Sequence, residues 1–228
     1  MGATNQAPYT ATDGLGKPLL TASSLSVVIP LRRGSVGCPG KSLRPFQGST
    51  LLEHAVRDAE ALDPARIIVT TDYEAGELPE KARPYWVTRP AHLCGPDTPM
   101  ALVLTHVSRE FSSIDTLLLL QPNCYHIDRV RLALRVLKER AAGTSVRYPD
   151  FWHPAYAIGG KMPGNRQGLK PAFRPDGLVY RMPVAHLLMI HPFQGTYIQV
   201  EGTVNVDTEQ DWLHLQERYA HPSRLICG

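Results

Sequence analysis

Several features that mark whole classes of protein are missing from this sequence. The four cysteines form no CxxC pair, and with the nine histidines they form no cluster at zinc-binding spacing. This argues against a disulfide framework and is typical of reduced, cytoplasmic thiols. The chain begins without the basic and apolar regions of a secretory signal, and its apolar run at 117–120 is too short to span a bilayer. We therefore expect a cytoplasmic protein with no membrane partner.

An excess of charge of one sign is also lacking. The 24 Lys and Arg residues are nearly matched by 21 Asp and Glu residues, for a net charge of +3. Most nucleic-acid-binding proteins are far more basic, so we expect no nucleic-acid partner. Hydrophobic residues make up 43% of the 228 residues, which is typical of a globular protein with one good-sized core. Residues 1–24 are predicted to form a mobile tail, and residues 25–228 a single domain.

Apolar runs that are typical of buried strands alternate with amphipathic segments that are typical of helices. This alternation predicts an α/β protein with three layers, in which helices cover both faces of a mostly parallel, Rossmann-like sheet. Ligands of such sheets bind beyond the carboxyl ends of the strands. Strands are expected at 24–30, 66–71, 85–88 and 115–120, and helices at 51–59, 99–111 and 128–141.

Residues 148–176 interrupt this pattern. They contain aromatic residues, several glycines and prolines, and no clear period. We expect a short excursion from the sheet, either a flap or a lobe for dimerisation. Strand patterns return at 177–181, 196–200 and 203–206, and a last helix is expected at 208–219.

The loop after the first predicted strand, LRRGSVGCPGKS at 31–42, has a composition suited to phosphate. Small residues let backbone N–H groups approach phosphate oxygens, and Arg32 and Lys41 can neutralise them. The loop is not a Walker A motif, because Ser35 stands at the position of the first glycine and Pro39 removes an N–H. A merely flexible connection between strand and helix would also explain this composition.

Six segments in order carry a resemblance to a known family. They are VVIPLRRGSVGCPGKSLRPFQGSTLLEHAV at 27–56, IVTTD at 68–72, VTRPAHL at 87–93, LLQP at 119–122, RQGL at 166–169 with AFRPDG at 172–177, and VDTE at 206–209. In this order they resemble the acylneuraminate cytidylyltransferases, which activate acidic sugars with CTP. The resemblance covers about residues 25–220 and implies the nucleotidyltransferase fold.

The resemblance also implies roles for individual residues. The implied substrates are CTP and an acidic sugar, the cofactor is Mg2+, and the assembly is a homodimer. The implied catalytic residues are Arg32, Lys41 and Gln121, and the implied nucleotide-binding residues are Ser35, Gly37, Ser42 and Arg89. The residues implied to bind the sugar are Arg166, Arg174 and Tyr180. The residues implied to bind the metal are Asp207 and Asn205.

Three departures from the family pattern bear on these roles. Asn205 stands where the family has a second aspartate, so Mg2+ should bind less tightly. The segment 121–127 lacks the family's arginine, and the excursion at 148–176 is shorter than the family's dimerisation lobe. An altered acceptor or nucleotide, or a binding protein with little catalysis, would also fit these changes.

Three of the assigned residues have simpler structural explanations. Asp207 could instead be the N-cap of the last helix, because VDTEQDW fits a cap followed by an acidic first turn. Tyr180 could be a packing residue at the end of a strand. An arginine such as Arg174 is more often an ion-pair residue at a surface or interface than a catalytic one.

Overall fold

The fold was analysed in a computed structural model, which describes residues 25–111, 113–138, 142–147, 174–184, 187, 195–200 and 202–220. The predicted tail at 1–24 lies outside these residues. The helices are α1 (Leu51–Glu60), α2 (Met100–Glu110), α3 (Arg129–Lys138) and α4 (Glu209–Tyr219). The strands are β1 (Leu25–Pro30), β2 (Pro45–Phe46), β3 (Ser49–Thr50), β4 (Arg66–Thr71), β5 (Trp86–Thr88), β6 (Thr116–Leu120), β7 (Cys124–Tyr125), β8 (Ala142–Arg147), β9 (Arg174–Pro183), β10 (Gly195–Gln199) and β11 (Val204–Asn205).

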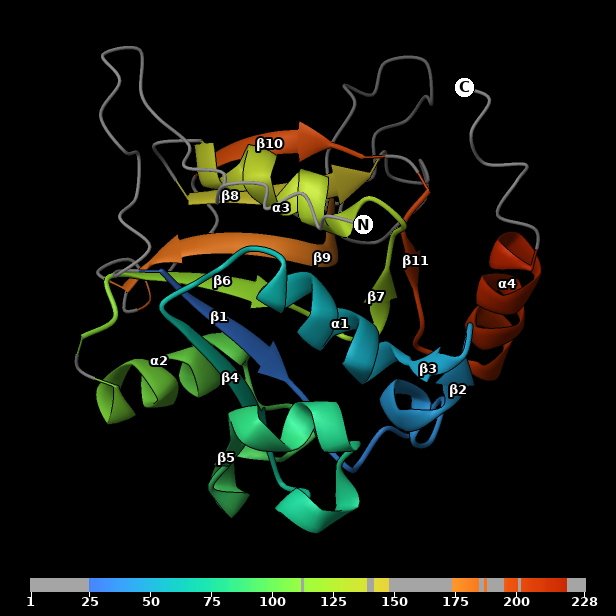
Figure 1. Cartoon of the computed structure of the whole chain (residues 1–228), viewed down its shortest axis with the longest axis horizontal. Helices are drawn as coiled ribbons and strands as arrows, with labels where there is room; N and C mark the ends of the chain where they lie inside the picture. Colours follow the sequence, from blue (N-terminus) through green and yellow to red (C-terminus); the bar gives the residue numbers. More distant parts are fainter. Residues whose placement is uncertain are drawn as a thin grey trace, which may run out of the picture.

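A seven-stranded sheet with the order β10-β8-β9-β6-β1-β4-β5 organises the molecule (Figure 1). β1 pairs in parallel with β4 and β6, β4 with β5, and β10 with β8. Only β9 runs against its neighbours β6 and β8. The carboxyl ends of β1, β4, β6 and β8 therefore lie at one edge of the sheet. The predicted mostly parallel sheet is confirmed.

Helices cover both faces of this sheet, as the three-layer prediction requires (Figure 1). Successive residues of a strand point to opposite faces, and the buried side chains of β6 divide accordingly. Leu118 and Leu120 pack with α1 and α3, whereas Leu117 and Leu119 pack with α2. Full burial on both sides explains why strands such as TLLLL are apolar throughout.

A third apolar cluster joins α4 to the edge of the sheet from which the loops emerge. Trp212 and Leu215 of α4 pack with Phe46, Tyr125 and Val206. β11 pairs antiparallel with β7, so the chain before α4 is tied to the loop after β6. This cluster fixes the position of Asp207, which lies between β11 and α4.

Both amphipathic helices that flank this edge begin with a capping box. Thr50 caps α1 with Glu53. Thr208 caps α4 with Asp211. The alternative reading of Asp207 as this N-cap is therefore wrong: Asp207 precedes the cap, and its backbone N–H donates to Asp211.

Two parts of the predicted pattern differ from the structure. β8 was not predicted, because its sequence AGTSVR begins with alanine and glycine, which are poor strand formers. Residues 174–176, assigned to the excursion, belong to β9. The remainder of the excursion, 148–173, lies outside the described residues.

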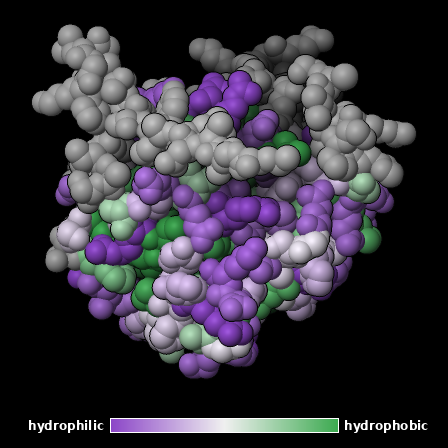
Figure 2. Space-filling model, viewed as in Figure 1, coloured by the Kyte–Doolittle hydropathy of each residue, from purple (hydrophilic) through white to green (hydrophobic). Residues whose placement is uncertain are grey.

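Polar and apolar side chains are interspersed over the described part of the face shown in Figure 2. Within that part of the chain, none of the helices has the length and apolar character needed to cross a bilayer.

Candidate active site

A small cavity opens where the loops after β1, β5 and β6 meet. Its volume is about 190 Å³, less than the roughly 300 Å³ at which pockets for whole small-molecule ligands begin, so it suits part of a nucleotide. The wall contains seven of the residues predicted from the sequence: Arg32, Ser35, Lys41, Ser42, Arg89, Gln121 and Asp207. Pro30, Leu31, Met100 and Asn123 complete it. The lining residues are up to 177 positions apart in the chain, and the sheet brings them together.

The loop at 31–44 is anchored at both ends by arginines outside the cavity. The guanidinium of Arg33 donates two hydrogen bonds to Glu77, at 2.9 and 2.5 Å, and lies 4.3 Å from the ring centroid of Tyr73. Arg44 donates two hydrogen bonds to Glu209 at the start of α4, both 2.6 Å. These paired contacts hold the intervening residues against the cavity, and the Arg33 bond lowers the pKa of Glu77.

Gly37 marks the closest approach between this loop and the chain before α4. A Cβ at this position would lie only 2.4 Å from the carbonyl oxygen of Asp207. Glycine is therefore required here by the contact, and a larger residue would displace either the loop or Asp207.

Arg89 is the most deeply buried cation of the cavity, with 4% of its surface exposed. One guanidinium nitrogen donates to the carbonyl oxygen of Thr70 at 2.8 Å, but Nε has no hydrogen-bond partner. Among the described residues no carboxylate forms an ion pair with Arg89, and burial lowers its pKa. A buried cation without a counter-ion is costly, so this position suits an anionic ligand.

Lys41 and Asp207, which both line the cavity, are in contact with each other. Nζ of Lys41 donates to Oδ1 of Asp207 at 2.9 Å and to the carbonyl oxygen of Val206. The side chain of Lys41 is only 13% exposed, whereas that of Asp207 is 61% exposed. The cavity wall thus holds three cations and one carboxylate, an excess of two positive charges that suits a polyphosphate.

The donor set can be tested against Mg2+, the cofactor that the family resemblance implies. Mg2+ is usually held by one or two carboxylates together with substrate phosphates and water. Asp207 fits this role, because its carboxylate is exposed beside the cavity. Asn205 does not fit as a ligand, because its side-chain oxygen accepts hydrogen bonds from Asn123 and Cys124 and its nitrogen faces Asp207. Among the described residues, no three His, Cys, Asp or Glu side chains form a cluster suited to a metal.

The loop after β6 contributes Gln121 and Asn123. Asn123 was not singled out in the sequence, although its position two residues after Gln121 on the same rim was a signal. Arg129, which is 1% exposed, donates to the backbone oxygen of Cys124 at 2.8 Å and is paired with Asp58 at 2.7 Å. Arg129, two positions after segment 121–127, therefore anchors this loop.

Of the predicted sugar-binding residues, Tyr180 is the one whose side chain the structure describes, and it does not line the cavity. Tyr180 is 6% exposed and packs in the apolar cluster beneath α2 with Val28 and Leu119, so its packing explanation holds. A role of Tyr180 in sugar binding stays a prediction. Arg174 begins β9 opposite Arg147, and Arg166 lies outside the described residues.

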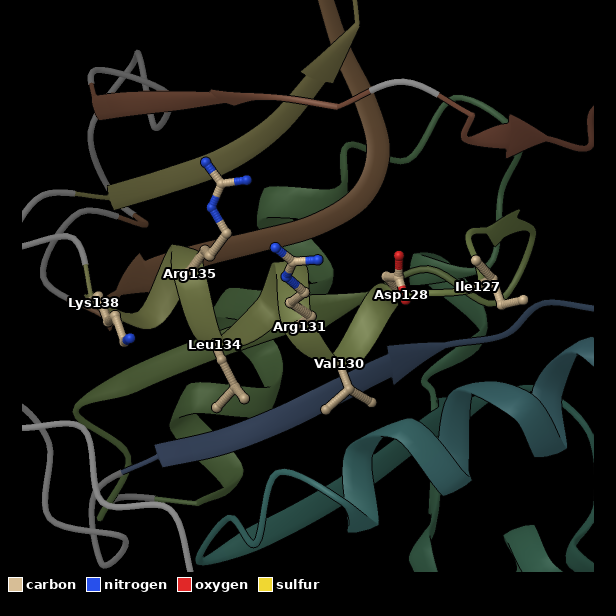
Figure 3. A pocket seen from close by; sticks show the side chains of 7 residues that line it. All are labelled: Ile127, Asp128, Val130, Arg131, Leu134, Arg135 and Lys138. Atoms are coloured by element: carbon tan, nitrogen blue, oxygen red, sulfur yellow. The ribbon is translucent and has the colours of Figure 1, made fainter. Parts of the chain in front are cut away.

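A larger hollow of about 530 Å³ lies along α3, away from these residues (Figure 3). Arg131 and Arg135 point to one side of the helix in this view, and Val130 and Leu134 to the other. Its wall contains none of the residues predicted from the sequence, so it is not the predicted site.

Part of the chain, including the loop at 31–44 that lines the cavity, is similar in sequence to known proteins. Residues 26–84 match the family model described as cytidylyltransferase. A 3-deoxy-manno-octulosonate cytidylyltransferase of Idiomarina loihiensis is 47% identical over 49 residues, which are 22% of this chain. The matched segment spans only about a fifth of that relative, 19% of its length.

Solved structures match over most of the chain at low sequence identity. A CMP:2-keto-3-deoxy-manno-octonic acid synthetase complexed with CTP aligns with a TM-score of 0.62 and 16% identity, over 88% of this chain and 100% of the other. A 4-diphosphocytidyl-2C-methyl-D-erythritol synthase from Anaerococcus prevotii aligns with a TM-score of 0.57 and 10% identity, over 89% and 99%. At such identities the likeness establishes the fold. The sequence match and the shared fold together support the cytidylyltransferase family, without the specific acylneuraminate assignment, and indicate a nucleotidyltransferase.

Proposed function

We propose that the protein transfers CMP from CTP to a hydroxyl group of an acidic keto-sugar and releases pyrophosphate. The observation that carries this proposal is the cavity itself, where Arg32, Lys41 and the uncompensated Arg89 face one anion-sized space. The cytidylyltransferase match at 26–84 includes the loop with two of these cations, which favours CTP as the source of the phosphates.

The transfer forms a bond between the acceptor oxygen and the α-phosphorus and breaks the bond between the α- and β-phosphates. Negative charge grows on the departing pyrophosphate, and fixed cations in a dry site stabilise it. Arg89 and Lys41 would bind the phosphates. The anchored loop at 31–44 would hold them in line with the acceptor, and Gln121 would orient that acceptor at the rim. Asp207 would bind Mg2+, which supplies further charge neutralisation when present.

Two sequence similarities of different strength support the proposed acceptor. The octulosonate enzyme is similar to this chain over 49 residues, and the resemblance to acylneuraminate enzymes includes Arg166, whose guanidinium could pair with a carboxylate. Both relatives act on acidic sugars, so this class of acceptor is the one we propose. The cytoplasmic location and the homodimer stay predictions.

Two measurements test the function. In the first, the melting temperature is recorded with each of the four nucleoside triphosphates and Mg2+, and CTP should raise it most, because a ligand of the native state stabilises it by mass action. Equal shifts for all four would contradict the choice of base. In the second, pyrophosphate release is screened with CTP against a panel of keto-sugar acids. Binding of CTP without release for any acceptor would favour the alternative of a binding protein with little catalysis.

A further inference from the structure

The side chain of Asn205 connects Asn123 and Asp207, which both line the cavity, through a chain of hydrogen bonds. Nδ2 of Asn123 donates to Oδ1 of Asn205 at 2.8 Å, and the thiol of Cys124 donates to the same oxygen at 3.1 Å. Nδ2 of Asn205 then donates to Oδ2 of Asp207 at 2.7 Å. The side chains of Asn205, at the end of β11, and Asp207, just beyond it, therefore point toward each other.

The direction of these bonds determines what Asn205 can offer a cation. Its oxygen is the only atom that could coordinate Mg2+, and this oxygen already accepts two hydrogen bonds. Its nitrogen, which cannot bind a cation, faces Asp207. Coordination by Asn205 would require the amide to turn and both donors to be released.

Close packing holds the thiol of Cys124 in place. Cys124 is fully buried, and a Cβ added to Gly177 would come within 2.6 Å of its sulfur. Gly177 has a φ of +86°, in the region that favours glycine, so the backbone of β9 can approach the thiol. The sulfur is therefore confined beside Asn205.

We propose that Asn205 is a positioning residue, which orients the carboxylate of Asp207 for a single Mg2+ and does not bind the cation itself. The proposal rests on the function proposed above. Asp207 is the most exposed member of the cavity, and an exposed carboxylate would rotate freely without support. Lys41 holds one of its oxygens and Asn205 the other, so the carboxylate keeps one orientation while its remaining lone pairs stay available.

The hydrogen-bond chain also connects the cation to the acceptor side. Asn123 lines the cavity on the rim loop and anchors the oxygen of Asn205. A ligand that moves Asn123 would therefore move the support of Asp207. We expect occupation of the acceptor side to change cation binding, and the cation to change acceptor binding by the same factor.

Cys124 allows a test at a position outside the cavity wall. Cys124→Ala removes the donor to Asn205, whereas Cys124→Ser keeps one in a side chain of nearly the same size. If Asn205 only positions Asp207, Cys124→Ala should weaken cation binding about fivefold, and Cys124→Ser should retain it. If Asn205 is a ligand, the opposite is expected, because loss of the donor frees its oxygen.

Binding is measured with Mn2+ by electron paramagnetic resonance, which needs no turnover. Asn205→Leu should weaken binding about tenfold or more, and Asp207→Asn should abolish it. Melting temperatures of all variants separate an effect at the site from loss of folding. Equal or tighter binding in Cys124→Ala than in Cys124→Ser would overturn the proposal, as would unchanged binding in Asp207→Asn.

The titrations use pyrophosphate as well as CTP as the anion. If the unaltered protein binds Mn2+ with pyrophosphate but does not respond to CTP, the proposed function fails. The comparison of the two Cys124 variants with pyrophosphate decides the role of Asn205 in either case.

Discussion

The two sides of the cavity are built differently. On the nucleotide side, Arg89 is buried and the loop at 31–44 is held by bidentate ion pairs at both ends. On the acceptor side, Gln121 and Asn123 stand on a short loop, Tyr180 is withdrawn into the core, and Arg166 lies outside the described residues. The cytidylyltransferase match covers residues 26–84, and so falls wholly on the nucleotide side.

This difference separates two kinds of chemical requirement. A polyphosphate needs several fixed cations, whatever sugar it meets, so the nucleotide side keeps recognisable residues. The acceptor side needs shape and a few directed contacts, which can be supplied by many sequences. If the division is correct, changes on the nucleotide side should affect turnover with every acceptor.

The largest effect is expected for Lys41→Ala. This change removes a cation from the cavity and the support of one oxygen of Asp207. Turnover should fall about 100- to 1000-fold, as it does when one donor to a developing oxyanion is removed. Pyrophosphate release, measured at saturating CTP with each active acceptor, checks the prediction.

Lys81→Ala is the matched control, because Lys81 is exposed and lies outside the cavity. It should leave turnover unchanged. A Lys41→Ala variant that folds and keeps most of its activity would place the triphosphate elsewhere.

An intermediate effect is expected for Arg89→Met, which keeps an unbranched apolar stem but removes the guanidinium and its charge. Affinity for CTP should fall about tenfold or more, because hydrogen bonds to charged groups are among the stronger ones. The melting temperature without ligand should stay level or rise, since the variant no longer buries an uncompensated cation. Calorimetric titration and thermal melting measure the two quantities.

Arg109→Met on the exposed side of α2 serves as the control, and it should change neither the affinity for CTP nor the melting temperature. A loss of stability in Arg89→Met without a loss of CTP affinity would show that Arg89 is a structural residue, and the comparison between the two sides would lose its main support.

The smallest effect concerns the ion pair between Arg33 and Glu77. The hydrogen bond from Arg33 lowers the pKa of Glu77 below its ordinary value of 4.5. The stabilisation is therefore present above pH 4.5 and is lost as the pH falls through the lower, folded-state pKa. Glu77→Gln should reduce the melting temperature at pH 7 by no more than about 2 °C, and the difference should vanish near pH 3.

The same variant, Glu77→Gln, tests whether the anchoring of the loop at 31–44 matters for CTP binding. CTP affinity of Glu77→Gln should decrease slightly at pH 7, because the loop loses one anchor. Glu80→Gln, an exposed residue nearby, controls for the change of net charge. Equal effects of both variants would mean that charge alone is responsible.

Most of the fold could be predicted from sequence periodicity. The strands at β1, β4 and β6 and the helices α1 to α4 have strong apolar patterns, because burial on one or both sides imposes them. β8 lacked such a pattern, since Ala142 and Gly143 supply little side chain to bury. Its place in the sheet depends on pairing with β9 and β10, which are more than twenty residues away.

The nucleotide side of the site was likewise predictable, because its cations follow strands whose ends must meet at one edge. The direction of the hydrogen bonds at Asn205 and the choice between the two explanations of Tyr180 were not predictable. Both depend on which way a side chain turns, and this is decided by partners such as Asn123 that are remote in the sequence. A motif specifies which residue is present but not the direction of its hydrogen bonds.

The antiparallel strand β9 has a consequence for how the acceptor could be changed. Arg147 at the end of β8 lies opposite Arg174 at the start of β9, at the same edge of the sheet as the cavity. The segment between them therefore leaves and re-enters the sheet at adjacent positions. Because closing a longer loop costs only about 0.6 kcal/mol for each doubling of its length, this segment can be exchanged without altering the register of the sheet. The paired ends of β8 and β9 therefore stay fixed in the sheet whatever the length of the chain that joins them.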